Sequence, residues 1–514
     1  MNSNIDKKLI ARNTLVLYFR MFFVMAVSIF TTRIVLKNLG EQDYGIYNVV
    51  AGFVSMLVFL NSSMASATQR FLTFEIGKQD TAGLENIFCQ AMSIHILIAL
   101  IFVLFAETVG LWFVCNQLNI PLERFNAAIW VYQFAILSFV LSILTVPFNA
   151  SIIAHEQMSI YAAVSIIDVV LKLIIAYAIT VISFDKLVTY SVLMFIAAFV
   201  PSFVYWLYCR LKFTECHYHF YFDKTKFTEI FSFAGWNIIG NFAYVLRNQG
   251  SNILLNIFFG PAVNAARGVS AQVESAVSSF VANFQTASNP QIIKSYAVGA
   301  YKESMTLVCQ CSKFSFYLIL TISIPIIFQA EYVLNLWLGT VPKYTVIFVQ
   351  VMLINATLDS ISSPLKTQAK ATGNIKTYMI VQGGFFLLAL PVIYIFLKIG
   401  FNPVSSVIVL LIFTFLGIFL RLFLVKRITS GFSVIEYLEV LKAGLIVSLV
   451  CGLLCYGIGL LFPTNSLLTF GLKTILIVFA TLFTVYTLGI NKTERNIVQR
   501  KFKEYINKWN QKKQ

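Results

Sequence analysis

Charged residues are scarce in this sequence. They make up 12% of its 514 residues, whereas a soluble domain carries about 25%. Hydrophobic residues account for 58% of the chain, and the mean hydropathy is +0.80. A chain of this composition cannot hide its apolar surface in water. The scarcity of charge therefore predicts an integral membrane protein whose solvent is the lipid bilayer.

The sequence also lacks the features of a nucleic-acid-binding protein and of an ATPase. Its net charge of +16 comes from basic residues that cluster in short loops and in the tail, and no nucleic-acid-binding motif occurs. No P-loop motif GxxxxGK(S/T) is present, and the longest segment between apolar stretches covers only residues 209–232. We therefore expect no nucleic-acid partner and no enzymatic domain. Energy for transport would come from an ion gradient, the membrane potential or substrate supply.

The eight cysteines carry little information. They form no recognisable disulfide framework, and the polar start of the chain, residues 1–8, is unlike a signal peptide. The run Cys216-His217-Tyr218-His219 contains metal-binding residue types, but no second ligand cluster accompanies it. The sequence thus predicts no metal site and no cofactor.

What the sequence does contain is a series of about fourteen apolar stretches, each near the roughly 20 residues that span a membrane. The predicted fold class is all-α, a polytopic integral membrane protein with about fourteen transmembrane helices. The second, eighth and tenth stretches are richest in Ser, Asn and charge, and a transporter would turn these toward its interior. The predicted spans are residues 14–36, 44–67, 87–113, 127–150, 158–182, 187–208, 233–259, 263–287, 307–328, 346–365, 378–397, 403–424, 441–462 and 467–488.

Lysine and arginine are distributed unevenly between the two sides that these spans define. With an even number of spans, the side that holds both termini carries about four times as many basic residues as the other. The positive-inside rule therefore predicts that both termini are cytoplasmic.

An internal repeat is visible when the chain is aligned with itself. Gly40 corresponds to Gly260, and at the same shift the run Ser66-Ala67-Thr68-Gln69 corresponds to Thr286-Ala287-Ser288-Asn289. We call the shift that takes Gly40 to Gly260 the repeat offset. A repeat unit of six helices predicts two parallel, pseudo-symmetric six-helix lobes, which would rock against each other for alternating access. The predicted parts are an N-terminal lobe (1–226, helices 1–6), a C-terminal lobe (227–430, helices 7–12), two extra helices (431–490) and a basic cytoplasmic tail (491–514).

Polar side chains follow one face of two neighbouring spans. Arg247 lies deep in an apolar stretch, where a fixed charge is costly and usually faces a polar interior. The stripes include Asn241 and Asn248 on the first helix, and Asn264, Arg267 and Glu274 on the second. They predict a hydrated, cationic cavity between the lobes, lined by helices one, two, seven and eight.

Several motifs resemble Wzx-type polysaccharide flippases of the multidrug/oligosaccharidyl-lipid/polysaccharide exporter superfamily. They are Arg33-Ile34-Val35-Leu36, Leu39-Gly40-Glu41-Gln42-Asp43-Tyr44-Gly45, Phe233-Ala234-Gly235-Trp236-Asn237, Gly260-Pro261-Ala262-Val263-Asn264 and Ala287-Ser288-Asn289-Pro290. The resemblance covers essentially the whole chain. It implies a two-lobed helical bundle in the bacterial inner membrane that moves undecaprenyl-diphosphate-linked oligosaccharide from the cytoplasmic to the periplasmic leaflet. The implied partners are this lipid-linked oligosaccharide, the lipid bilayer, and a polysaccharide polymerase with its chain-length machinery.

The polar residues of the predicted cavity suit such a substrate. Arginine makes paired, charge-assisted hydrogen bonds with phosphate, so Arg247 and Arg267 are predicted to hold the diphosphate. The resemblance to cavity arginines of the family adds Arg20. Asparagine amides suit sugar hydroxyls, and the predicted binding amides are Asn241, Asn248 and Asn264.

Each candidate also has a structural interpretation. Arg247 could instead pair with Glu274, which is otherwise a candidate coupling carboxylate, and Arg20 and Arg267 could snorkel to the membrane surface. Asp168 and Lys172 are spaced i and i+4, which favours a mutual ion pair over a coupling role. Asp359 has no partner nearby in its span and is a further coupling candidate. Lys366 and Lys370 are interpreted as positive-inside residues rather than phosphate ligands.

Two other functions remain open at this point. A cation-coupled multidrug exporter of the same superfamily would have twelve helices and an acidic cavity. An integral-membrane glycan polymerase or ligase would carry a large periplasmic loop with Arg or His chemistry, but the longest outward loops here, near residues 116–125 and 329–345, are short.

Overall fold

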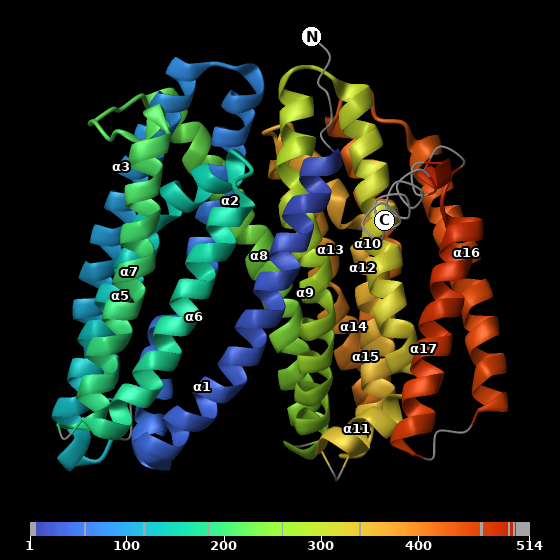
Figure 1. The fold of residues 1–514 in the computed structure, drawn as a ribbon, viewed down its shortest axis with the longest axis horizontal. Helices are drawn as coiled ribbons and strands as arrows, with labels where there is room; N and C mark the ends of the chain where they lie inside the picture. The colour runs from blue at the N-terminus through green and yellow to red at the C-terminus, as the bar shows by residue number, and fades with distance from the viewer. Residues whose placement is uncertain are drawn as a thin grey trace, which may run out of the picture.

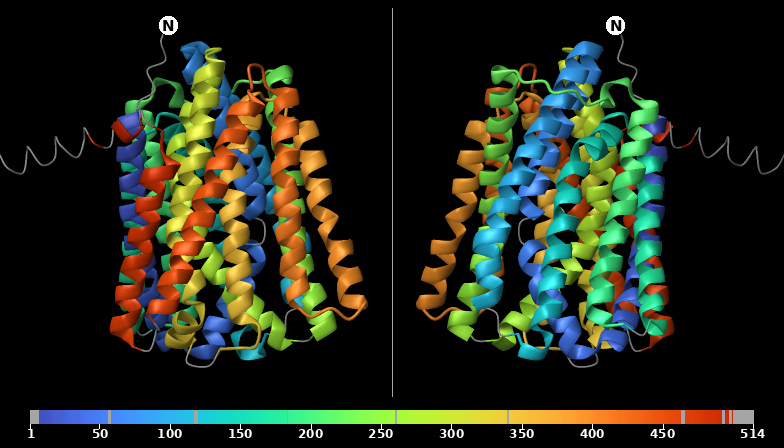
Figure 2. Two further views of the ribbon diagram at one scale, coloured as in Figure 1. Left: turned by 90° about the vertical axis from the view of Figure 1, so that its right-hand side faces the viewer. Right: turned by 90° about the vertical axis from the view of Figure 1, so that its left-hand side faces the viewer.

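The computed structural model describes residues 7–55, 58–116, 120–182, 184–259, 261–338, 341–462, 466–491, 494–496 and 499. Within these ranges the regular secondary structure is entirely helical, with no strand. The long helices run side by side along one common direction, as both side views show (Figure 2). The predicted all-α fold class is therefore confirmed.

The helices fall into three groups along the chain (Figure 1). The N-terminal half comprises α1 (Lys7–Ser55), α2 (Val58–Lys78), α3 (Thr81–Phe105), η1 (Ala106–Gly110), α4 (Leu111–Asn116), η2 (Leu122–Arg124), α5 (Phe125–Ala154), α6 (Met158–Val181), α7 (Lys186–Lys212) and η3 (Thr214–Cys216). The C-terminal half comprises α8 (Lys224–Phe259), α9 (Pro261–Ala297), α10 (Tyr301–Phe328), α11 (Ala330–Leu338), α12 (Thr345–Ala371), α13 (Lys376–Leu387), α14 (Ala389–Lys398) and α15 (Val404–Ile428). The final pair consists of α16 (Val434–Leu461) and α17 (Leu467–Thr484), with η4 (Val485–Gly489).

Eleven helices in the described part of the chain are long and apolar enough to cross a membrane. The protein is thus a multi-pass membrane protein. The three predicted spans outside this set are residues 44–67, 233–259 and 263–287, two of which carry the polar stripes. Span 44–67 falls on the end of α1 and the start of α2, whereas α8 and α9 run the length of the bundle (Figure 1). The total of fourteen spans remains a prediction.

Helix packing separates the bundle into local groups. In the N-terminal half α5 packs against α7, α3 and α2, and α1 packs against α6. In the C-terminal half α12 is central and contacts α9, α10 and α15. The final pair, α16 and α17, packs against α10 at one edge of the molecule (Figure 1). The proposed boundaries of the two lobes, near residues 226 and 430, remain a prediction.

Backbone landmarks recur at the repeat offset seen in the sequence. That offset takes the start of α3 to the start of α10, and the start of α5 to the start of α12. It also takes Gln79 to Gly299, both of which have positive φ angles, 61° and 77°. Glu156 and Gly373, with φ angles of 60° and 80°, follow α5 and α12 at a slightly smaller shift, because α5 has 30 residues and α12 has 27. The repeat is therefore structural, with a change of register within this pair of helices.

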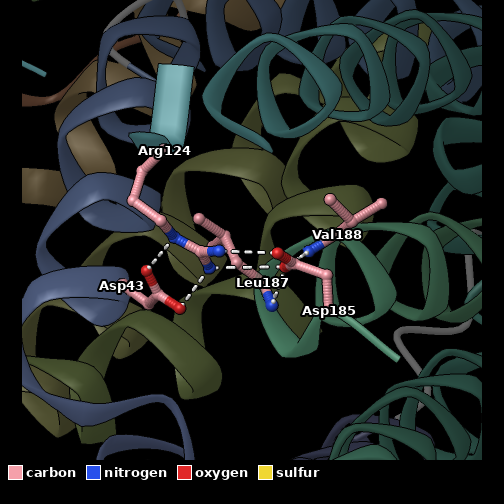
Figure 3. A network of polar contacts seen from close by, with 5 residues as sticks. All are labelled: Asp43, Arg124, Asp185, Leu187 and Val188. Atoms are coloured by element: carbon pink, nitrogen blue, oxygen red, sulfur yellow. Dashed lines mark hydrogen bonds and ion pairs between the residues drawn. The ribbon is translucent and has the colours of Figure 1, made fainter. Parts of the chain in front are cut away.

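One charged network lies where α1, η2 and α7 meet (Figure 3). Arg124 Nε donates to Asp43 Oδ1 at 2.8 Å, and Arg124 Nη1 donates to Asp185 Oδ2 at 2.6 Å. Asp185 also caps α7 by accepting hydrogen bonds from the backbone N–H groups of Leu187 and Val188. Asp43, part of a motif that suggested the family, thus has a structural role.

This network predicts a specific acid sensitivity. Partial burial raises the pKa of Asp185, but the hydrogen bonds from Arg124 and from the backbone outweigh it and hold the pKa below the ordinary 3.8. A depressed carboxyl pKa contributes stability above the unfolded pKa and loses it as the pH falls through the folded pKa. We expect the melting temperature of purified protein to lose this contribution only below about pH 4. In Arg124→Ala the acid-induced drop should be smaller; an equal drop would contradict this account.

The two ends of the described chain lie towards the same end of the bundle, the upper one in Figure 1. Near the C-terminal end, Tyr317 of α10 donates to the carbonyl of Gly489 at 2.9 Å. Lys313, which is buried, pairs with Glu494 at 2.7 Å. These contacts attach the segment after α17 to the middle of α10.

The predicted topology is open to a direct test. Reporter domains fused at Gln514 and at Asn465 are expected to report opposite sides of the membrane, with Gln514 on the cytoplasmic side. The reason is the distribution of Lys and Arg between the loops. Reporters on the same side would refute the predicted fourteen-span topology.

Candidate functional site

Two adjoining polar cavities lie within the C-terminal half, enclosed by α8, α9, α10, α12, α13 and α15. Their volumes are about 290 and 180 Å³, and Tyr244, Asp359 and Ser363 line both. The first cavity is lined further by Gly240, Asn241, Lys366, Met379, Gln382, Gly383, Phe386 and Arg421. The second is lined further by Arg247, Glu274, Ser278, Val281, Ala282, Gln285, Ile319, Asn355, Ala356 and Ser360.

Arg421 anchors the first cavity through a network that uses its whole guanidinium group. Its Nη1 donates to Asp359 Oδ1 at 2.8 Å and to Ser362 Oγ at 2.6 Å. With the Gln382 amide oriented to satisfy its neighbours, the amide oxygen accepts from Arg421 Nε and Nη2 at 2.7 and 2.9 Å, and the nitrogen donates to the Tyr378 hydroxyl. Asp359, for which the sequence shows no nearby partner, therefore has one on a different helix, α15.

Arg247 occupies the second cavity without such partners. It is 5% exposed, and its guanidinium lies over the rings of Tyr244 and Phe386, 5.2 and 4.8 Å from their centroids. Within the described part of the chain no carboxylate lies within 4.0 Å of it, and its Nε has no hydrogen-bond partner. Glu274 lines the same cavity but forms no ion pair with it. The aromatic faces reduce the cost of this charge without neutralising it.

Positive charge exceeds negative charge across the two cavities. Their charged lining residues are Lys366, Arg421 and Arg247 against Asp359 and Glu274. Because Arg421 and Asp359 neutralise each other, Arg247 and Lys366 remain against Glu274, which leaves a surplus of one positive charge. The site therefore has the electrostatics of an anion-binding site.

Only some of the polar residues predicted to form the stripes line these cavities. Asn241 lines the first cavity, where its Oδ1 faces Lys366 Nζ at 3.5 Å. Asn248 is half-buried beside Tyr244 but does not line either cavity. Arg267 is buried against the sulfur of Met352 and does not line them either. Asn264 lies in α9, but its side chain is outside the part that the structure describes.

The remaining candidates lie in the N-terminal half. Arg20 is half-buried, with its guanidinium 4.6 Å from the centroid of the Tyr161 ring. Asp168 and Lys172 form the ion pair that their spacing favours, with Nζ 2.7 Å from Oδ2. The described residues contain no group of three potential metal ligands.

The location of these cavities differs from the expectations from the sequence, and a cavity between the lobes stays a prediction. The predicted cavity lay between the lobes and used helices one and two, whereas no described residue of α1 or α2 lines these cavities. Lys366 is interpreted from the sequence as a positive-inside residue, and Arg421 is not among the predicted site residues. Both instead face a cavity. One feature of the sequence indicates the location of Arg421: the residue falls inside an apolar span, 403–424, where a charged side chain needs a polar environment.

The two halves pack against each other through α2 with α8 and α9 and through α1 with α9, and a polar contact joins them near the chain termini, where α2 meets α12 and α5 meets α9. Arg70 donates to the carbonyls of Lys370 and Ala371, both at 3.1 Å, at the negative end of the α12 dipole. Glu156 accepts from Gln291 at 2.6 Å and forms an ion pair with Lys294. From this contact α1 leans away from α9 toward the opposite end of the bundle, the lower one in Figure 1.

Gly373 makes this contact possible, which leads to a prediction. Its φ is +80°, and a Cβ there would lie 2.7 Å from Arg70 Nη2. We expect Gly373→Ala to weaken the contact and to lengthen the distance between spin labels at positions 78 and 374. Gly299→Ala is the matched control, because Gly299 has a similar φ of +77° but no atom within 4 Å of its Cβ position. Equal effects of the two substitutions would show that only backbone strain matters.

Comparisons with known proteins agree with this architecture. The polysaccharide biosynthesis protein family matches residues 10–331. An outward-facing multidrug resistance MATE family transporter of the MOP superfamily is similar in structure, with a TM-score of 0.69 at 13% identity, covering 85% of this chain and 97% of that one. MATE in the straight conformation has a TM-score of 0.71 at 12% identity and covers the same shares.

A MOP superfamily transporter from Pyrococcus furiosus, whose binding pocket is described as having reverse polarity, has a TM-score of 0.63 at 14% identity. It covers 83% of this chain and 98% of that one. No curated protein matches the chain. At these identities the structural likeness establishes the fold.

Proposed function

Because this chain belongs to the polysaccharide biosynthesis protein family and has the fold of the MOP transporters, we propose that it is a flippase for lipid-linked oligosaccharides. Its substrate would be an undecaprenyl-diphosphate-linked repeat unit, moved from the cytoplasmic to the periplasmic leaflet of a bacterial inner membrane. Polymerase and chain-length proteins would then use the translocated unit.

One observation carries the proposal: a buried arginine without a carboxylate partner among the described residues faces a polar cavity. A diphosphate cannot cross hydrocarbon because its charge would lose solvation. Arg247 and Lys366 can replace that solvation, and the planar guanidinium can form paired bonds with phosphate oxygens. The apolar lipid tail needs no enclosure, since it can remain in the bilayer during translocation.

The contact between the halves suits alternating access. The contact closes the bundle at the end where the chain termini lie. The distribution of Lys and Arg assigns this end to the cytoplasmic side. On that assignment the described state is closed to the cytoplasm. Breaking the contact around Arg70 and Glu156 would expose the interior to the leaflet where the substrate is made.

Multidrug export is the second candidate, and the shared MATE fold favours it. The fold alone does not separate the two functions, and the charge of the site supports the flippase. A cationic drug would be repelled by the net positive charge of the lining, whereas an anionic diphosphate would be attracted.

Reconstitution into liposomes tests the proposal. Protein in vesicles is expected to translocate lipid-linked oligosaccharide extracted from the inner membrane, measured as its accessibility to a periplasmic-side glycan-modifying enzyme. The same vesicles should not accumulate a cationic dye under a proton or sodium gradient. Dye transport without glycan translocation would overturn the proposal in favour of a multidrug exporter.

A further inference from the structure

A third cavity lies in the N-terminal half, between α2, α5 and α7. Its volume is about 400 Å³, within the range of about 300–1,000 Å³ typical of ligand pockets. Its polar lining is made of amides and hydroxyls, and no described residue that lines it carries a charge. The polar side chains that matter here are those of Asn61, Gln69, Ser142, Asn149 and Tyr205. We call this cavity the neutral pocket.

The neutral pocket is the counterpart of the charged cavities under the internal repeat. On α2, residues 61, 62 and 65 line it, and the repeat offset takes them to Val281, Ala282 and Gln285, which line the second charged cavity. Residues of α5 correspond to residues of α12 at the slightly smaller shift, the one that takes Glu156 to Gly373. The two halves therefore place their cavities at equivalent positions.

The charged residues have neutral equivalents in this pocket. The shift that applies to α5 takes Ser142 to Asp359 and Asn149 to Lys366. Helices α7 and α15 both end in an extended cap residue, Phe213 and Thr429, and aligning these two caps places Tyr205 at the position of Arg421. Three of the five charged side chains, those of Asp359, Lys366 and Arg421, thus correspond to side chains that are uncharged but can still form hydrogen bonds.

Amides in the pocket have unused hydrogen-bonding capacity. Gln69 and Asn149 are half-buried and form no hydrogen bond with another described residue. Asn61 Nδ2 donates to Ser142 Oγ at 2.6 Å, but its buried Oδ1 has no partner among the described residues. Since buried polar groups are normally satisfied, these amides are suited to a ligand that both donates and accepts hydrogen bonds.

The neutral pocket and the charged site flank the same helix. Asn61 of α2 lines the neutral pocket, and Ser63, two residues further along the helix, accepts a hydrogen bond from Asn241 of the charged site at 2.8 Å. An α-helix with its side chains is about 10–12 Å across. One molecule that carries an anionic group and a neutral polar group could therefore reach both sites.

We infer that the neutral pocket binds uncharged sugar residues of the substrate while the charged cavities hold its diphosphate. This inference rests on the proposed flippase function and divides the substrate between the two halves. Sugars offer hydroxyls to the amides and C–H faces to apolar lining residues such as Val146 and Ile153. A diphosphate would find no cation among the described residues of the pocket, and a hydrocarbon tail would leave the amides unpaired.

Binding measurements with two ligands that differ only in their glycan test this inference. The probes are undecaprenyl diphosphate and the same lipid carrying the complete oligosaccharide, titrated against full-length protein in nanodiscs. We expect Gln69→Ala/Asn149→Ala to weaken binding of the glycosylated lipid by roughly tenfold or more, because two amides lose their hydrogen bonds. Binding of the sugar-free lipid should stay within about twofold of wild type. The matched control is Asn116→Ala/Gln133→Ala, which removes the same two residue types outside the pocket.

The outcomes separate this inference from the proposed function. Equal weakening for both lipids would place the tail or the diphosphate in the pocket and overturn the inference. No weakening for either lipid, with wild-type binding intact, would also overturn it. If the wild-type protein binds neither lipid, the proposed function itself fails. Monodispersity on size exclusion shows whether each variant is folded, and Gln69→Asn with Asn149→Gln, which keep the amides, should bind better than the alanine variant.

Discussion

Replacing Arg247 with alanine is expected to abolish glycan export and to leave the amount of protein in the membrane near normal. Each hydrogen bond from a charged group contributes about 1.5–3 kcal/mol, so losing two bonds to the diphosphate should slow export by roughly a hundredfold or more. Protein abundance should survive because Arg247 has no ion pair with a described residue. Removing it therefore leaves no buried carboxylate uncompensated.

Lysine at the same position should restore part of the activity, because its ammonium group carries the positive charge but lacks the planar guanidinium that makes paired hydrogen bonds. Export is measured by complementation of a flippase-deficient strain, with membrane protein levels read in parallel. Arg210→Ala is the matched control, since Arg210 also lies over an aromatic ring, that of Trp206, but is exposed at the end of α7. It should export normally.

Two results would count against this role for Arg247. Full export by Arg247→Ala at normal abundance would remove it from the binding site. Low abundance that is restored by a second change, Glu274→Ala, would instead show that the two residues stabilise each other. The second result would favour the structural interpretation that the sequence leaves open.

Removing Asp359 is expected to destabilise the protein, in contrast to removing Arg247. Asp359→Ala leaves Arg421, which is 7% exposed, without its carboxylate. Breaking a buried pair costs about 3–5 kcal/mol. We expect the lower end, because the Asp359 side chain is 42% exposed to the cavity and because Ser362 and Gln382 still accept hydrogen bonds from Arg421.

Thermal unfolding in detergent, together with protein abundance, measures this effect. The double variant Asp359→Leu/Arg421→Leu should recover most of the stability, since apolar residues can replace a buried ion pair. Asp168→Ala is the matched control. Its partner Lys172 lies at i+4 and both side chains are about one-third exposed, so its loss should cost well under about 1 kcal/mol. Equal destabilisation by Asp168→Ala and Asp359→Ala would contradict the importance of burial.

Much of the architecture could be predicted from local properties of the chain. Apolar length predicted a polytopic helical membrane protein, because the thickness of the bilayer sets the length of a span. The repeat seen in the sequence recurs in the structure, where the same offset relates the starts of α10 and α12 to those of α3 and α5. The i,i+4 spacing favoured the Asp168–Lys172 pair, because residues four apart are neighbours on any α-helix. Each of these inferences needs only information within one helix or one repeat unit.

The composition of the site was decided by packing between helices. Arg421 reaches Asp359 because α15 packs against α12 in one particular register, and nothing within either span specifies that register. Arg247 lies beside Phe386 of α13 rather than in an ion pair with Glu274, although helical spacing permitted either arrangement. The same packing placed the charged cavities within the C-terminal half instead of between the halves.

By itself, the sequence determined the solvent of this protein, its helical class, its repeat and the presence of costly buried charges. Hydrophobic length and helical periodicity follow from covalent geometry and from the bilayer, so they can be inferred without a fold. Only the tertiary structure decided which of those charges are neutralised and which remain available to a ligand. Ion pairing depends on distances of a few ångströms between side chains on different helices, and these distances are set when the helices pack.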